Sequence, residues 1–309
     1  DVSHCNFWCV AENDVIMSKL TRLKPSPIPA IHPVAEYAVE GEAARWYAEM
    51  KSALQVPWMG VVTMAFAHYP HFFAALWQGT SPIVSSQAFV AAAQSLQASV
   101  EKDVTNLHPP VIADRLAATG YGAREIEQIR AANDVFSHGN HHYALIATIA
   151  RTLLEGRDLT NTDDAVPFVG RHAPEVSVPF VLMEAHHADA PTRAVYEDIK
   201  EVLGLPFVNT DYRAFARWPS YWTLAWNDLR QVAGGDGHEA LCQSYHDAMA
   251  EIVTTTLPNP ARLTSKMLRD AAEADGGLAE ITDVVRLFQW LLPGLAVNVA
   301  YLRHQLRST

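Results

Sequence analysis

The chain carries Tyr196-Glu-Asp-Ile-Lys-Glu-Val-Leu-Gly-Leu-Pro206, then Asp211-Tyr-Arg-Ala-Phe-Ala-Arg-Trp-Pro219 and Trp226, and it carries this stretch twice. The earlier copy reads Tyr47-Ala-Glu-Met-Lys-Ser-Ala-Leu-Gln-Val-Pro57, Val62-Thr-Met-Ala-Phe-Ala-His-Tyr-Pro70 and Trp77. At one constant offset of 149 residues, nine positions are identical, including two prolines and a tryptophan. Chance does not keep nine identities in register without a gap, so we interpret the chain as a tandem duplication.

The apolar residues of both copies follow helical spacing, and alternating strand patterns are nearly absent. We therefore expect an all-α fold in which two helical repeats pack as one pseudo-two-fold body, with the active site between them. The Gly139-Asn140 pair predicts a break between two helices, one ending at His138 and one beginning at His142. The expected divisions are an N-terminal tail and Pro-rich lead-in (1–40), repeat 1 (41–156), an inter-repeat linker (157–190) and repeat 2 (191–309).

Composition narrows the class of protein. Hydrophobic residues make up 49 % of the 309 residues, which is ample for a core, and the formal net charge of −11 argues against a nucleic-acid partner. Three cysteines cannot cross-link a chain of this length, so we expect a reducing compartment and a cytoplasmic protein. The most apolar run, Leu287 to Leu302, is interrupted by Gln289, Pro293 and Asn298, which favours a buried core helix over a membrane span.

The first sixteen residues differ from the rest and lack the apolar region of a signal peptide. We expect a loose tail there, with Met17 as a natural start. His4, Cys5 and Cys9 could in principle share a metal ion.

Two residues break the symmetry of the repeat, and both are polar. Asp211 stands where the first copy has Val62, and Asn140 stands where the second copy has Leu292 at an offset of 152. Each residue also has a structural interpretation: Asp211 can cap the next helix, and Asn140 can sit in a turn or at an N-cap. If the copies meet at a shared seam, a carboxylate and an amide in one pocket can hold and deprotonate a water molecule.

Four segments, Val56-Pro-Trp58, Pro70…Leu76-Trp77, His138-Gly-Asn-His-His-Tyr143-Ala-Leu and Asp211-Tyr-Arg-Ala-Phe-Ala-Arg-Trp-Pro219, resemble the non-stereoselective D,L-2-haloacid dehalogenase family. The resemblance spans roughly 42–302. It implies an all-helical homodimer without cofactor or bound metal, which hydrolyses both enantiomers of short halogenated carboxylic acids to 2-hydroxy acids with inversion. It also implies that Asp211 and Asn140 hold the attacking water and that Trp58 lines the substrate pocket.

The chain departs from the family pattern at three pocket positions. Thr210 replaces a serine before the catalytic aspartate, Val61 replaces a bulky aromatic residue, and Phe288 replaces a tyrosine. We expect Trp58, Val61, Phe288 and Leu292 to form an apolar wall that desolvates substrate and halide, although each is equally credible as plain core.

Three alternatives stay open. Asp211 could attack carbon itself and form an ester. The chain could be a helical binding protein for a small carboxylate, in which Asp211 only caps a helix. A metal hydrolase would need a clear three-ligand set, and the sequence shows a single Glu-x-x-His motif, Glu184 to His187. His138 and His141 could line the pocket, but a polar rim is the favoured interpretation.

Overall fold

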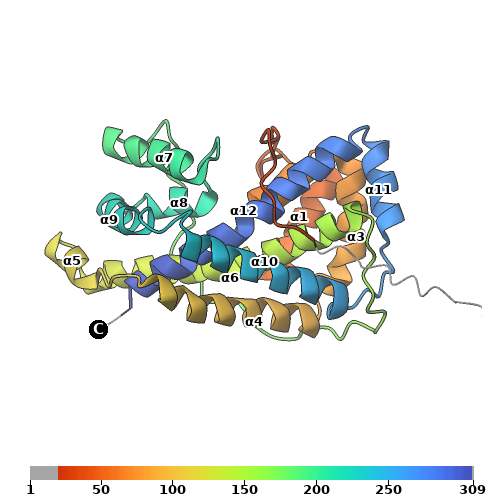
Figure 1. Cartoon of the computed structure of the whole chain (residues 1–309), viewed down its shortest axis with the longest axis horizontal. Helices are drawn as coiled ribbons and strands as arrows, with labels where there is room; N and C mark the ends of the chain where they lie inside the picture. Colours follow the sequence, from red (N-terminus) through yellow and green to blue (C-terminus); the bar gives the residue numbers. More distant parts are fainter. Residues whose placement is uncertain (1–19, 308–309) are drawn as a thin grey trace, which may run out of the picture.

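The computed structural model describes residues 20–307, and over this range the chain is helical and forms no strand (Figure 1). This confirms the predicted all-α class. The expectations for residues 1–16, including His4, Cys5 and Cys9, lie outside the described residues. The helices are α1 (Gly41–Leu54), α2 (Val61–Phe66), α3 (Pro70–Val84), α4 (Gln87–Asp103), the 3-10 helix η1 (Val104–Leu107), α5 (Ala113–Ala118), α6 (Ala123–Leu154), α7 (Ala190–Leu203), α8 (Thr210–Phe215), α9 (Pro219–Leu229), α10 (Asp236–Thr255), α11 (Ser265–Ala274) and α12 (Leu278–Gln305).

Two long helices, α6 and α12, form the centre of the molecule and make its most extensive helix–helix contact. Every residue of α6 from Val135 to Leu154 is buried, so this half of the helix is covered on all sides. Figure 1 shows α4 and α10 along one side of the pair, with α1, α3 and α11 near one end and α7, α8 and α9 near the other. The central pair thus connects the two groups of short helices.

The predicted helix break at Gly139-Asn140 is wrong, because α6 runs through both residues without interruption. Glycine is needed here for packing and not for a turn: a Cβ at position 139 would lie 2.4 Å from Cη2 of Trp58. Burial of the whole helix outweighs the unfavourable helix propensity of one glycine, about 1 kcal/mol. As a result, Asn140 is held in the middle of a rigid helix.

The helices of the two copies correspond in order, α1–α6 with α7–α12, and both copies contain equivalent hydrogen bonds. These bonds support the duplication. The duplication and its domain boundaries nevertheless stay predictions. The stretch 155–189 between the copies contains no helix. Two equivalent pairs are Tyr47 Oη to Val34 O (2.8 Å) with Tyr196 Oη to Met183 O (2.7 Å), and Trp77 Nε1 to Glu49 Oε2 (3.1 Å) with Trp226 Nε1 to Asp198 Oδ2 (2.6 Å).

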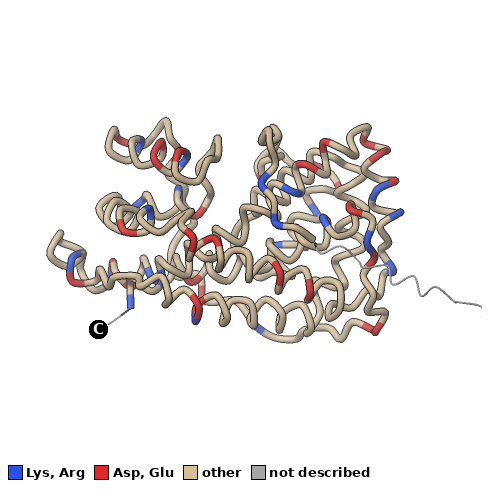
Figure 2. The backbone as a smooth tube through the Cα atoms, viewed as in Figure 1, with Lys and Arg blue, Asp and Glu red and all other residues tan. Residues whose placement is uncertain are grey.

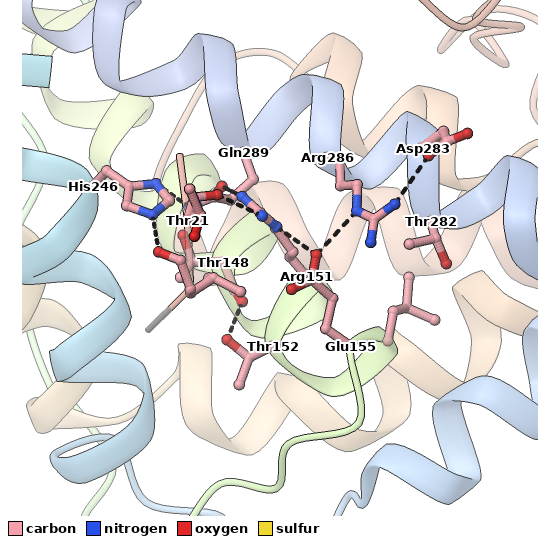
Figure 3. Close-up of polar contacts among 12 residues, drawn as sticks. Thr21, Thr148, Arg151, Thr152, Glu155, His246, Thr282, Asp283, Arg286 and Gln289 are labelled. Atoms are coloured by element: carbon pink, nitrogen blue, oxygen red, sulfur yellow. Dashed lines mark hydrogen bonds and ion pairs between the residues drawn. The ribbon is translucent and has the colours of Figure 1, made fainter. Parts of the chain in front are cut away.

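A buried polar network ties the central helices together (Figure 3). Arg151 of α6 is 4 % exposed and donates to Gln289 of α12, to Glu155 Oε1 (3.0 Å) and to the carbonyl of Thr21 (2.7 Å). Gln289 Nε2 in turn lies 2.8 Å from Nδ1 of His246 on α10. A buried guanidinium needs such partners, because an unpaired charge in the interior is strongly destabilising.

Charged residues of both signs are distributed along the peripheral helices (Figure 2). Helix α12 is long and apolar enough to cross a membrane, but 83 % of its most apolar window, which has a mean hydropathy of 1.3, is buried among the other helices. This is the environment expected of a core helix.

Candidate active site

A cavity of about 450 Å³ is lined by residues of both predicted copies, and all seven predicted site residues line it. Helices α2 and α6 supply one side, and α7, α8 and α12 supply the other. The lining is mainly apolar with a few polar groups, as expected of a small-molecule site. The seven residues are Trp58, Val61, Asn140, Thr210, Asp211, Phe288 and Leu292.

Asp211 and Asn140 are in direct contact within this cavity. Asn140 Nδ2 donates to Asp211 Oδ1 at 2.7 Å, and each residue is 3 % exposed. Asn140 lies in mid-helix and is therefore neither a turn residue nor an N-cap. Asp211 lies in the first turn of α8, whose N-cap is Asn209, so the capping interpretation of Asp211 is wrong as well.

Burial changes the acidity of Asp211. Desolvation, the largest effect, raises the pKa of its carboxyl group to about 6, against the opposing influence of the Asn140 hydrogen bond, its own backbone N–H and Arg213. Charge is disfavoured inside an apolar cavity, which makes the carboxylate a stronger base than an exposed aspartate. Its pKa nevertheless leaves it mostly ionised at neutral pH, as a general base requires.

The neighbouring residue Tyr212 fixes α8 in place. Its ring is fully buried and stacks on Trp222 with 5.2 Å between ring centroids, and its hydroxyl accepts from Asn298 Nδ2 at 2.8 Å. Because Tyr212 is anchored in the core of the second copy, Asp211 is directed towards α6 from a rigid position.

The apolar wall is built around Trp58. Its ring stacks on Phe180 with centroids 5.5 Å apart and contacts Phe136 at 4.9 Å, while its carbonyl accepts from Tyr143 Oη at 2.6 Å. Phe288 packs edge-on against Phe66 on the α12 side. These contacts restrict both rings, so the wall is preformed.

Several polar lining residues were missed from the sequence, although the repeat carried a signal for them. Asn209 and Arg213 replace Gly60 and Met64 of the first copy, so polar residues at four positions of 209–213 stand where the first copy is apolar or glycine. Arg213 Nη1 lies 2.8 Å and 2.9 Å from the carboxylate oxygens of Glu184. The Arg213 Nε and the Asn209 Oδ1 are buried without a hydrogen-bond partner.

The histidines near Asn140 do not belong to this cavity. His138 and His141 are 5 % and 2 % exposed, so the polar-rim interpretation is wrong, and neither lines the cavity. His141 Nδ1 instead lies 2.6 Å from the hydroxyl of Tyr245 on α10. Burial lowers the pKa of His141 to about 3, which keeps the ring neutral.

Comparison with known proteins identifies the family, although no protein-family model matches the chain. The chain is 47 % identical over 253 residues to an (R)-2-haloacid dehalogenase of Rhizobium sp. (strain NHG3), covering 82 % of this chain and 98 % of that protein. A configuration-inverting 2-haloacid dehalogenase of Alcaligenes xylosoxydans xylosoxydans is 22 % identical, covering 89 % and 93 %. A solved structure of a D-2-haloacid dehalogenase with L-LA superposes with a TM-score of 0.84 at 33 % identity, covering 94 % of this chain and all of that one. The chain therefore belongs to the 2-haloacid dehalogenases, a family of hydrolases that act on carbon–halide bonds.

Proposed function

We propose that this protein hydrolyses short (R)-2-haloalkanoic acids to 2-hydroxy acids of inverted configuration, using a water molecule held by Asp211 and Asn140. The observation that carries the proposal is the 2.7 Å hydrogen bond between these two residues inside an apolar cavity shared by both copies. The dehalogenase relatives supply the reaction class.

The pair has the hydrogen-bonding capacity that the reaction needs. One N–H of Asn140 is used to hold Asp211, while the Asn140 carbonyl oxygen can accept from a water molecule and orient it. The other Asp211 oxygen takes a proton from that water while the water oxygen attacks C2 of the substrate on the side opposite the halogen. A carbon–oxygen bond forms, the carbon–halogen bond breaks with its electron pair, halide leaves, and the configuration at C2 is inverted.

The residues around the pair are suited to the two negative charges of the reaction, which are the substrate carboxylate and the departing halide. The apolar wall around Trp58 excludes bulk water, so solvent does not hydrate the Asp211 carboxylate, which stays a strong base for the attacking water. Among the residues that line the cavity, Arg213 has a buried Nε–H without a partner, which leaves it free to donate to the substrate carboxylate. A donor without a partner in the interior gains most from a charged acceptor.

The enantiomer preference rests on the relatives. The expectation that both enantiomers react remains a prediction, whereas the relative at 47 % identity is named an (R)-2-haloacid dehalogenase. Halide release from separate samples of D- and L-2-chloropropionate in EDTA tests this directly. We expect release from the D enantiomer. Release from L alone, or from neither, would overturn the proposal, and release from both would restore the broader expectation.

The ester mechanism is separated by a single turnover in H₂¹⁸O with enzyme in excess. Direct attack puts ¹⁸O in the first product molecule. An Asp211 ester instead gives unlabelled product first and leaves ¹⁸O in the Asp211 carboxylate. Label in the first product is the result that our proposal requires.

The family resemblance implies a homodimer, and the low cysteine content favours a cytoplasmic location. We propose both on that basis, and sedimentation of the purified chain tests the first.

A further inference from the structure

Three histidines gather on the side of α6 that faces away from Asn140. His138 and His142 come from α6, two residues before and after Asn140, and His172 comes from the stretch 155–189. One nitrogen from each ring lies within 4.8 Å of the others. The ring centroids are 4.3 Å apart for His138–His142, 5.2 Å for His138–His172 and 5.3 Å for His142–His172.

Hydrogen bonds to backbone carbonyls fix the tautomer of all three rings. A carbonyl oxygen can only accept, so the bonded nitrogen must carry a proton, and in a neutral imidazole the other nitrogen then carries a lone pair. The lone pairs therefore belong to His138 Nδ1, His142 Nε2 and His172 Nδ1. The bonds are His138 Nε2 to Leu54 O (2.9 Å), His142 Nδ1 to His138 O (2.8 Å) and His172 Nε2 to Ala53 O (3.2 Å).

Two of these lone pairs have no partner in the protein. His142 Nε2 and His172 Nδ1 are buried atoms without a hydrogen bond, and His142 as a residue is only 2 % exposed. The three ring nitrogens also lie too close together for all the rings to carry a positive charge, and neither unpartnered nitrogen has an acceptor to which an added proton could be donated. Neutral imidazoles with unused lone pairs are metal ligands, and an unsatisfied buried acceptor is otherwise costly.

We propose that His138 Nδ1, His142 Nε2 and His172 Nδ1 bind one Zn²⁺ ion, with water in the fourth position. With a zinc–nitrogen distance of about 2.0–2.1 Å, two imidazoles on a tetrahedral ion have ring centres about 5 Å apart. Two of the three observed centroid distances match this value, and the third is shorter by less than 1 Å. Small side-chain rotations complete the geometry.

The surroundings resemble those of a built metal site. Ligating histidines almost always donate their second N–H to a carbonyl or carboxylate, which orients the ring and raises its basicity. Two of the carbonyls here, Ala53 and Leu54, end α1, where the helix dipole favours a nearby cation. The Gln55 side chain holds the His172 segment by accepting from His172 N at 2.9 Å and donating to Gly170 O at 2.8 Å.

The site belongs to the first copy alone and stands apart from catalysis. At the repeat offset of 152, Trp290 and Gly294 replace His138 and His142. Two residues along a helix is a rotation of about 200°, so both ligands lie opposite Asn140. Bound zinc would pin the stretch 155–189 to α1 and α6, and hydrolysis at Asp211 would not use it. The expectation of no metal came from the family resemblance and from the lack of a clear three-ligand set in the sequence, and sequence spacing cannot detect a ligand 30 residues downstream.

The test uses the full chain, dialysed against EDTA and titrated with ZnCl₂ by calorimetry. We expect one zinc to bind through these ligands, and a melting temperature that rises by about 5 °C when free zinc is about 100-fold above Kd. Co²⁺ in place of zinc should give the visible absorption of a tetrahedral site. Halide release should be the same with and without metal, which keeps this test independent of the proposed function.

The matched variants are His172→Ala, which removes the half-buried ligand, and His71→Ala, which removes an exposed histidine elsewhere. His172→Ala should lose the zinc-induced shift, and His71→Ala should keep it. Each shift compares one variant with and without zinc, so a change in basal stability does not affect the readout. Equal zinc uptake and equal shifts in wild type and His172→Ala would overturn the proposal and assign the ion to other ligands, such as His4, Cys5 and Cys9. No shift in the wild type would overturn it too.

Discussion

Replacing Asp211 with asparagine should stabilise the protein while abolishing its activity. The substitution keeps the size of the side chain, and its carbonyl oxygen can still accept from Asn140 Nδ2. It removes a negative charge from a site that is 3 % exposed. An active-site carboxylate is thus expected to cost stability in exchange for its function.

The magnitude follows from the pKa of Asp211, which is raised from 3.8 to about 6 by burial. At about 1.4 kcal/mol per unit, keeping this group ionised in the folded state costs about 3 kcal/mol. The folded-state pKa of Asp211 lies above its unfolded value. The stability that this group contributes is therefore fully present below pH ~4, and this amount is lost as pH rises through ~6. Asp211→Asn does not titrate here, so its advantage should appear across that window.

The assay is thermal and urea unfolding of both proteins at pH 4, 5, 6, 7 and 8, with halide release measured in parallel. At pH 8 the variant should melt about 5 °C higher than the wild type, and near pH 4 the two should coincide. The control is Asp189→Asn, because hydrogen bonds from the side chain of Thr192 and from its backbone N–H, the latter at 2.9 Å, lower the pKa of Asp189. The control should therefore lose stability, relative to wild type, above pH ~4.

A pH-independent difference between wild type and Asp211→Asn would refute this reasoning, and so would a variant that is less stable at pH 8. Either result would mean that the carboxylate is hydrated or otherwise compensated in the folded protein. Retained halide release would in addition remove Asp211 from the reaction.

Three further predictions concern residues that position the site or the core. Asn140→Ala should lower kcat/KM by about 10²–10³-fold and move the acid limb of the pH profile above 6, because the Asn140 hydrogen bond lowers the pKa of Asp211. An acid limb that does not move would contradict the pairing of Asn140 with Asp211. Gly139→Ala should lower the free energy of unfolding by about 1–3 kcal/mol and raise KM, because the new Cβ would displace Trp58. The control Gly122→Ala, with open space around it, should lower it by under about 1 kcal/mol, and equal melting temperatures of the two variants would refute the packing argument. Arg151→Met should lower the free energy of unfolding in urea by about 3–5 kcal/mol and leave kcat of the folded enzyme unchanged. A stability equal to wild type would show that the polar network around Arg151 is dispensable.

Much of the candidate active site could be predicted because the predicted duplication supplies an internal comparison. Asp211 and Asn140 were found as polar residues whose counterparts are Val62 and Leu292, and the structure places them 2.7 Å apart. The same comparison also marks Arg213, whose counterpart is Met64, but only the structure shows its ion pair with Glu184.

The helix break predicted at Gly139 failed for a different reason. Glycine is a weak helix former, and its local signal is the same whether it ends a helix or admits a neighbouring ring. The contact with Trp58 comes from a segment about 80 residues earlier, so local sequence could not reveal it.

The sequence by itself determined the helical class, and it predicted the duplication and the polar residues that break its symmetry, because helical periodicity and residue identity are local properties. The tertiary structure alone decided that α6 is continuous, that the pKa of Asp211 rises to about 6, and that His172 joins His138 and His142. Each of these depends on which segments exclude water from one another. Desolvation and proximity between distant segments exist only once the chain is folded.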